Sequence, residues 1–207
     1  TRFHVVRLVD GHQSDVKYIA RPFFTFHHVN AFERDDCIVV DFCAYESAKL
    51  LTQFKLSELR QGRLPTEKAY LTRVIIPLNI PKGAKAGQNL LEGVSFAGHC
   101  KAVVHTDGCS IFLVSEMVVD TPFEMPRINY ALVNGLPYRF VYGSALPGND
   151  RVSLVKVDVI SKAVQTWWAG SATFYAGEPV FVPRTGNSSE DDGKYLLRNE
   201  NVFIEVI

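Results

Sequence analysis

Short apolar runs separated by turn residues constrain this chain more than any other feature. Runs rich in Val, Ile, Phe and Tyr recur at spacings of roughly ten residues, with turn pairs such as Asp107-Gly108 and Asn134-Gly135 between them. The pattern predicts an all-β fold, but no strict repeat distinguishes a sandwich, a barrel or a propeller. A helical pattern is expected only over Ala48–Arg60. We expect strands over Phe3–Val9, Cys37–Cys43, Arg73–Leu78, Ser110–Val114, Tyr138–Tyr142, Ser153–Ile160, Ala163–Trp168 and Val180–Val182.

Composition indicates one globular unit and argues against a nucleic-acid partner and against a membrane-spanning segment. The chain has 207 residues, of which 47% are hydrophobic and 21% charged. Lys plus Arg and Asp plus Glu both number 22, so no bulk positive charge would attract nucleic acid. No run reaches the roughly 18 uninterrupted apolar residues of a membrane span.

The cysteines predict a reducing environment. They lie in or beside apolar runs and form no CxxC pair, so buried free thiols are expected at Cys37, Cys43, Cys100 and Cys109. Free thiols indicate an intracellular, cytoplasmic setting. The chain begins at Thr1, without an initiator Met or a signal sequence, and we expect its beginning to be missing.

Two adjacent histidines stand in the most unusual segment, after three phenylalanines at positions 23, 24 and 26. Neighbouring side chains of a strand point to opposite faces, so His27 and His28 cannot both face one site unless a bulge intervenes. One of them could be a metal ligand, because neutral imidazole binds iron or zinc well. The alternative is two partly buried histidines that bond to the backbone.

The other polar residues form no local motif. The remaining histidines have no HxxxH or HExxH spacing, and no GxSxG or phosphate-binding glycine loop occurs. The polar stretch Arg184–Gly193, with the acidic residues 190–192, is expected to be a solvated surface loop. The residues alone leave the function open between a metal-dependent enzyme and a β-rich binding module.

Taken in order, the motifs resemble the carotenoid cleavage oxygenase family, and its animal branch most closely. That branch holds the β-carotene oxygenases and the retinoid isomerohydrolase. Phe26–Glu33 resembles the family signature F-H-x-x-N-A-[YF]-E. The further motifs that carry the resemblance are Cys37–Cys43, Arg73–Asn79, Met125–Tyr130, Tyr138–Gly143, Leu154–Val159 with Trp167, Tyr175–Pro183 and Glu190–Gly193.

The resemblance implies an iron site on a β-propeller. A seven-bladed propeller is implied, of which this chain would supply about three blades. Four histidines hold Fe²⁺ in the family, and the first histidine of F-H-x-x-N, here His27, is one of them. The glutamate of the E-P motif, here Glu178, would orient an iron-bound imidazole from behind, and we expect it close to His27.

The chain also departs from the family pattern. No equivalents of the first two histidine ligands precede His27, and no F-H-G motif supplies the fourth. Residues 1–193 are assigned to the propeller segment, whereas residues 194–207 form a divergent end that does not look like the expected apolar strand. As an isolated polypeptide, the chain is expected to be inactive and prone to aggregation, because one imidazole cannot hold iron and a cut propeller exposes strand edges.

The resemblance further implies a reaction and its partners. The parent protein would cleave a double bond of a β-carotene-like carotenoid with O₂ and release retinal or another apocarotenoid. Phe23, Phe24 and Phe26 would suit the lining of an apolar tunnel, although core packing explains them equally well. A carotenoid or retinoid, O₂ and the surface of a membrane are the expected partners. The alternatives are a retinoid isomerohydrolase and a non-catalytic, truncated carotenoid-binding paralogue.

Overall fold

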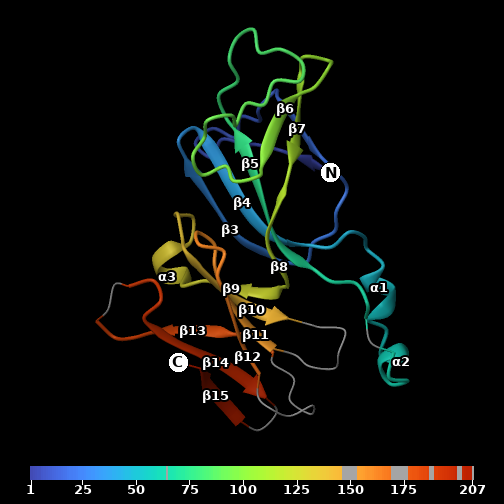
Figure 1. Ribbon diagram of the computed structural model, residues 1–207, viewed down its shortest axis with the longest axis vertical. Helices are drawn as coiled ribbons and strands as arrows, with labels where there is room; N and C mark the ends of the chain where they lie inside the picture. Colours follow the sequence, from blue (N-terminus) through green and yellow to red (C-terminus); the bar gives the residue numbers. More distant parts are fainter. Residues whose placement is uncertain (64, 146–152, 169–176, 187–188, 200–201, 207) are drawn as a thin grey trace.

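The described residues form four β-sheets, and the strands of the first two interleave along the chain (Figure 1). The computed structural model describes residues 1–63, 65–145, 153–168, 177–186, 189–199 and 202–206. The strands are β1 (Arg2–Phe3), β2 (Lys17–Ala20), β3 (His28–Arg34), β4 (Cys37–Ala44), β5 (Tyr70–Pro77), β6 (Lys101–Val104), β7 (Ser110–Val114), β8 (Glu116–Pro122), β9 (Glu124–Arg127), β10 (Phe140–Ala145), β11 (Ser153–Asp158), β12 (Val164–Trp167), β13 (Val180–Pro183), β14 (Gly193–Asn199) and β15 (Val202–Val206). The expected all-β class is therefore confirmed.

Three of the sheets have the form of propeller blades. Their strand orders are β3-β4-β5-β8, β9-β10-β11-β12 and β13-β14-β15, each antiparallel and each starting with its first strand at one edge. In each of these sheets the strands lie side by side in the order in which they occur along the chain. Sheets of this kind, repeated one after another, are typical of a β-propeller. The expectation of about three blades agrees with these three sheets.

The remaining sheet, β1-β2-β7-β6, includes one parallel pair, β2 with β7. Its inner face is apolar because every second residue is buried, as in Tyr18, Ala20, Ile111 and Leu113. Tyr18 donates a hydrogen bond to the Pro77 carbonyl of β5 at 2.6 Å, which ties this sheet to the first blade.

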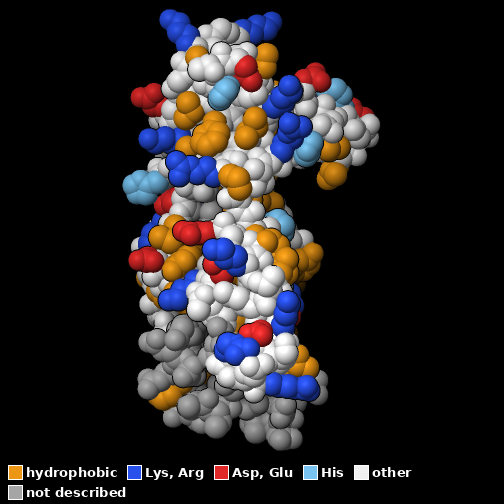
Figure 2. All heavy atoms as spheres, turned by 90° about the vertical axis from the view of Figure 1, so that its right-hand side faces the viewer, with side chains coloured by type: hydrophobic (Ala, Val, Ile, Leu, Met, Phe, Trp, Pro, Cys, Tyr) orange, Lys and Arg blue, Asp and Glu red, His pale blue; other side chains and the backbone are white. Residues whose placement is uncertain are grey.

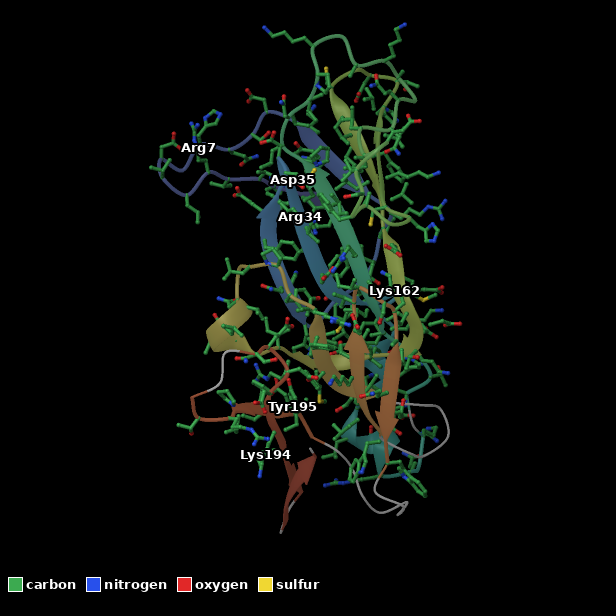
Figure 3. All side chains as sticks on the ribbon, turned by 60° about the vertical axis from the view of Figure 1, so that its left-hand side comes forward. Arg7, Arg34, Asp35, Lys162, Lys194 and Tyr195 are labelled. Carbon is green, nitrogen blue, oxygen red and sulfur yellow. The ribbon has the colours of Figure 1, made fainter. Side chains whose placement is uncertain are left out.

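The prediction of a strand over Phe3–Val9 is confirmed only at Phe3, because β1 ends there. After β1 the chain forms a loop that projects from the body, with Arg7 near its tip (Figures 2 and 3). Gly11 has a φ of +71° there, and Arg7 and Asp10 form a two-pronged ion pair at 3.0 and 2.6 Å. The apolar run Val5–Val9 therefore lies on a turn, with Leu8 98% exposed.

Helices are short in the described residues. The pattern over Ala48–Arg60 forms two single turns, α1 (Leu50–Gln53) and α2 (Leu56–Leu59), because Lys55 between them is extended, with a ψ of 132°. The third helix is α3 (Tyr130–Val133), between β9 and β10. No helix in the described part of the chain has the length and apolar character needed to cross a bilayer.

The first two blades share a buried charged cluster. Asp41 of β4, which is fully buried, accepts two hydrogen bonds from the Arg73 guanidinium of β5 at 2.8 and 2.7 Å. Tyr138, just before β10 of the next blade, donates to the same carboxylate at 2.5 Å. Burial, and then the negative charge of Asp41, raise the pKa of Tyr138 well above its usual range. The hydroxyl therefore stays protonated and joins the two blades.

The acidic segment after β13 joins the second and third blades. It was expected to be a solvated loop, but the Glu190 carboxylate accepts hydrogen bonds from the backbone amides of Arg139 and Phe140 at 2.8 and 2.6 Å. Asp191 bonds to Tyr142 and Lys156 of the neighbouring blade. Residues 190 and 191 do lie in a turn, but these contacts correct the expectation that they are simply solvated. Residues 187 and 188 lie outside the described residues.

The end of the chain is also β-structure. Residues 194–207 were expected not to look like an apolar strand, but β14 begins at Gly193 and pairs with both β13 and β15. The absence of an apolar pattern after Gly193 therefore does not indicate the absence of a strand. The division of the chain at residue 193 stays a prediction.

All four cysteines are free, and three of them are buried as expected. Cys109 is exposed because it follows the turn at Asp107, whose carboxylate accepts a hydrogen bond from its backbone amide at 2.9 Å. Burial raises the pKa of the Cys37 and Cys43 thiols and raises that of Cys100 to about 12.

The buried ion pair predicts a strong dependence of stability on Arg73. Replacing Arg73 with Met leaves the Asp41 carboxylate buried without its cation, which is expected to cost about 3–5 kcal/mol of the free energy of unfolding. Chemical denaturation of the purified protein measures this loss. Arg7→Met is the matched control, because Arg7 binds Asp10 in the same two-pronged geometry at the surface. Equal destabilisation by the two substitutions would contradict the importance of burial.

The thiols predict selective alkylation. A brief pulse of iodoacetamide at pH 8, followed by peptide mass spectrometry, is expected to label Cys109 much faster than the three buried cysteines. The reason is that alkylation requires an accessible thiolate, and raised pKa values keep the buried thiols protonated. Fast labelling of Cys43 in the folded protein would show that its surroundings are open to solvent.

Candidate functional site

His27 stands immediately before β3, where the regular ladder begins. Its carbonyl accepts hydrogen bonds from the Cys43 amide of β4 at 2.9 Å and from the Thr25 hydroxyl at 3.1 Å. The register of β3 against β4 shifts between His28 and Asn30, which marks a bulge directly after the histidine pair. The backbone of His27 is thus fixed, while its side chain remains 45% exposed.

The imidazole of His27 meets a buried carboxylate from the next blade. Its Nδ1 lies 2.6 Å from Oε2 of Glu124, the first residue of β9, and the Glu124 side chain is 7% exposed. A carboxylate at Nδ1 favours the tautomer that carries its proton on Nδ1, and Nε2 then keeps its lone pair for another partner. This arrangement is the usual support of a metal-binding histidine.

The backbone of β9 is shaped to place this carboxylate. Oε2 of Glu124 also accepts a hydrogen bond from the Met125 amide at 2.7 Å, and Met125 has the rare positive φ of +53°. Opposite stands Gly143 of β10, where an added Cβ would lie 2.6 Å from the Glu124 carbonyl and 2.7 Å from the Phe123 ring. Gly143 therefore permits a close approach of the strands that no larger residue allows.

The Glu124 carboxylate is surrounded by weakly polar groups. Oε1 is buried and has no hydrogen-bond partner among the described residues. Cys43 and Tyr45, at the end of β4, are both buried. Burial, and then the negative charge of Glu124, raise the pKa of both side chains well above their usual ranges. The Glu124 side chain therefore lies beside two neutral side chains, those of Cys43 and Tyr45.

The phenylalanines before His27 divide between core and surface. The Phe23 ring stacks on that of the buried Phe42 with centroids 4.7 Å apart, so Phe23 is partly buried against the core. Phe24 and Phe26 meet edge to face at 4.8 Å, and Phe26 packs against Tyr45 at 5.9 Å. Phe26 is 44% exposed and its ring centroid lies 6.4 Å from that of His27. The wall beside the imidazole thus consists of Phe24, Phe26 and Tyr45.

Glu178 does not lie behind His27, which corrects the expected pairing of these two residues. Its carboxylate forms an ion pair with Arg127 at the end of β9 at 2.7 Å and is 45% exposed. The place expected for it at Nδ1 of His27 is taken by Glu124. A role for Glu178 beside another iron-bound imidazole stays a prediction. Tyr175 and Ala176, which open its motif, lie outside the described residues.

The other histidines are separate from this pair. Nδ1 of His4 lies 3.1 Å from the Gln13 amide nitrogen, and that of His105 lies 3.7 Å from Oδ1 of Asp107. No group of three or more His, Cys, Asp or Glu side chains able to hold a metal ion occurs within the described ranges. Among the described residues, the part of a possible metal site that can be identified is therefore the His27 imidazole with the Glu124 carboxylate that supports it.

Sequence reasoning missed Glu124. Its motif was recognised from Met125 onwards, one residue too late. A signal was present, because Glu124 is an acidic residue between two apolar ones, Phe123 and Met125, in a short strand-like segment. A carboxylate at such a position is either exposed at an edge or buried with a partner, and the pattern does not distinguish the two.

Comparison with known proteins extends these observations. The sequence profile of the retinal pigment epithelial membrane protein family matches residues 1–198. Carotenoid-cleaving dioxygenase, mitochondrial, from Homo sapiens is 34% identical over 100% of this chain and 38% of its own length. Beta,beta-carotene 15,15'-dioxygenase from Mus musculus is 33% identical over 95% of this chain and 34% of its own length.

A solved structure shows the same fold. The crystal structure of cobalt-substituted Synechocystis apocarotenoid oxygenase superposes with a TM-score of 0.65 at 24% identity, and the match covers 95% of this chain and 34% of that one. The chain thus spans well under half the length of the relatives it matches. With a family profile that covers nearly all of its residues, the chain belongs to the retinal pigment epithelial membrane protein family of carotenoid oxygenases.

Proposed function

We propose that the protein to which this chain belongs is an Fe²⁺-dependent dioxygenase that cleaves a double bond of a β-carotene-like carotenoid with O₂. The products would be carbonyl compounds of the retinal or apocarotenoid type. The hydrogen bond between His27 and Glu124 carries the proposal, because a half-exposed imidazole braced by a buried carboxylate is suited to bind a metal. The names of the related dioxygenases support the reaction.

The two residues would have distinct tasks at the metal. His27 would be a ligand through Nε2, and Glu124 would hold the ring orientation and the proton on Nδ1. Iron, when bound, would supply the site at which O₂ reacts. One imidazole is an incomplete set of ligands, and the described residues contain no group of three or more possible donors, so the site would need ligands in addition to His27.

The apolar wall beside the imidazole suits a polyene substrate. Phe24, Phe26 and Tyr45 form a continuous aromatic surface next to His27, and the Tyr45 hydroxyl stays neutral because its pKa is raised. Such a surface binds hydrocarbon and excludes water from the reacting bond. Contact with a membrane surface would give the protein access to a lipid-soluble substrate, and we propose a cytoplasmic, peripheral location.

A second function shares this site. A retinoid isomerohydrolase would use the same metal and cleave an ester instead of a double bond, and the name of the matching family favours a retinoid-related substrate. Product analysis separates the two, because only cleavage of the polyene incorporates oxygen from O₂ into the products. Substrate incubated under ¹⁸O₂ followed by mass spectrometry makes the distinction.

The proposal predicts that His27→Ala in the full-length protein abolishes both bound iron and cleavage. The substitution removes one metal ligand, and the apolar wall beside position 27 provides no side chain to replace it. Elemental analysis of the purified variant measures iron, and product chromatography measures cleavage. His28→Ala is the matched control and is expected to retain both. Iron at the wild-type level in the His27 variant would refute the assignment of this ligand.

Replacing Glu124 with Gln is expected to weaken metal binding about 10- to 100-fold, because the neutral amide no longer fixes the Nδ1 proton of His27. Competition with a chelator measures the affinity. Glu178→Gln serves as the comparison: it is expected to lower activity with the fold intact, through a histidine other than His27. Wild-type affinity in the Glu124 variant would show that the carboxylate does not support the ligand.

A further inference from the structure

The side chain of Asn30 is buried and fully hydrogen-bonded. It is 6% exposed and lies three residues after His27. Its Nδ2 donates to the carbonyls of Val133 and Leu136 at 2.9 and 3.0 Å. Its Oδ1 accepts from the amides of Ala31 and Gly135 at 3.0 and 2.9 Å. Both N–H donors and both acceptor positions of the Asn30 amide are thus occupied, and the four bonds fix its orientation.

Three of these bonds connect the two blades that form the site. Asn30 belongs to β3, next to His27, whereas Val133, Gly135 and Leu136 belong to the segment around α3. That segment leads from β9, which carries Glu124, to β10. The amide therefore links the strand of the imidazole to the blade of its carboxylate.

The fourth bond supports the bulge after His27. The β3–β4 register shifts between His28 and Asn30, and the Ala31 amide bonds to the Asn30 side chain. A bulge leaves one residue unpaired and redirects the side chains before it. The same side chain thus stabilises the local backbone that sets the direction of His27.

We infer that Asn30 is a positioning residue for the metal-binding histidine: it holds β3 in register with the adjacent blade so that His27 meets Glu124. The inference rests on the proposed function. A hydrogen bond of 2.6 Å tolerates little displacement, because a shift of about 1 Å takes the two atoms beyond normal hydrogen-bond distance. Asp in place of Asn would turn an oxygen towards the two carbonyls of Val133 and Leu136, and this repulsion would move the strand.

The test compares Asn30→Asp with Asn129→Asp in the full-length protein. Asn129 is a matched control: it is 5% exposed, lies just before α3, and donates through Nδ2 to the Glu190 carbonyl at 3.3 Å. The readouts are the affinity for Co²⁺, the visible absorption spectrum of the Co²⁺ protein, and the midpoint of unfolding. Asn30→Asp is expected to bind Co²⁺ about 10- to 100-fold more weakly, with an altered spectrum. Asn129→Asp is expected to keep the affinity and spectrum of the wild type.

Wild-type affinity and spectrum in a folded Asn30 variant would overturn the inference, as would equal losses in both variants. If Asn30→Asp does not fold, Asn30→Ser takes its place, and failure of both to fold would assign Asn30 a purely structural role and reject the inference. If the wild type itself binds no metal, the proposed function fails. The positioning is then judged from crystal structures of metal-free protein: a broken His27–Glu124 hydrogen bond in the Asn30 variant supports it, and an unchanged one rejects it.

Discussion

The Asp41–Arg73 ion pair, with the Tyr138 hydroxyl bound to it, is the interaction on which the arrangement of the blades depends. Its charges lie in the apolar core, where an unpaired carboxylate would be costly, so the folded state must keep the three side chains together. Asp41 and Arg73 face one another on β4 and β5, whereas Tyr138 comes from the next blade. The cluster therefore defines how the first blade sits on the second.

Other, more exposed polar contacts also join neighbouring blades among the described residues. Glu190 binds the amides at the start of β10, and Lys162 reaches from the turn between β11 and β12 to Glu116 of β8 at 3.3 Å (Figure 3). Lys162 has a positive φ of 63° at this turn. Buried polar contacts specify one geometry where apolar packing alone tolerates several. The His27–Glu124 pair belongs to the same class of contact, which explains why the candidate site lies at a boundary.

The sequence predicted the elements that depend on local pattern. Cys37–Cys43 and Ser110–Val114 are continuous apolar runs, and both are strands within a residue of the expected bounds. The strand β9 was missed because its four residues include a proline and a glutamate. The polar segment of β14 was missed because its strand character comes from pairing with β13 and β15. The run Val5–Val9 was misread because an ion pair and a glycine turn outweigh its β propensity.

The candidate site was only half predictable for a related reason. Alternation of side chains allowed only one of His27 and His28 to face a site, and the family signature selected His27. The carboxylate that supports His27 could not be found in the same way, because only tertiary packing brings Glu124 next to His27. Glu178 was expected at this place because of its motif, but the motif does not indicate which histidine the glutamate contacts. Asn30 was likewise part of a recognised signature, but its four hydrogen bonds are visible only in the fold.

The separation of 97 residues between His27 and Glu124 has a consequence for the biogenesis of the protein. Contacts between residues so distant in the chain form late, since the loop that joins them must first be closed. While the ribosome is still making the second blade, the imidazole has no carboxylate beside it. The support of the imidazole by the carboxylate is thus complete only after the two blades have docked.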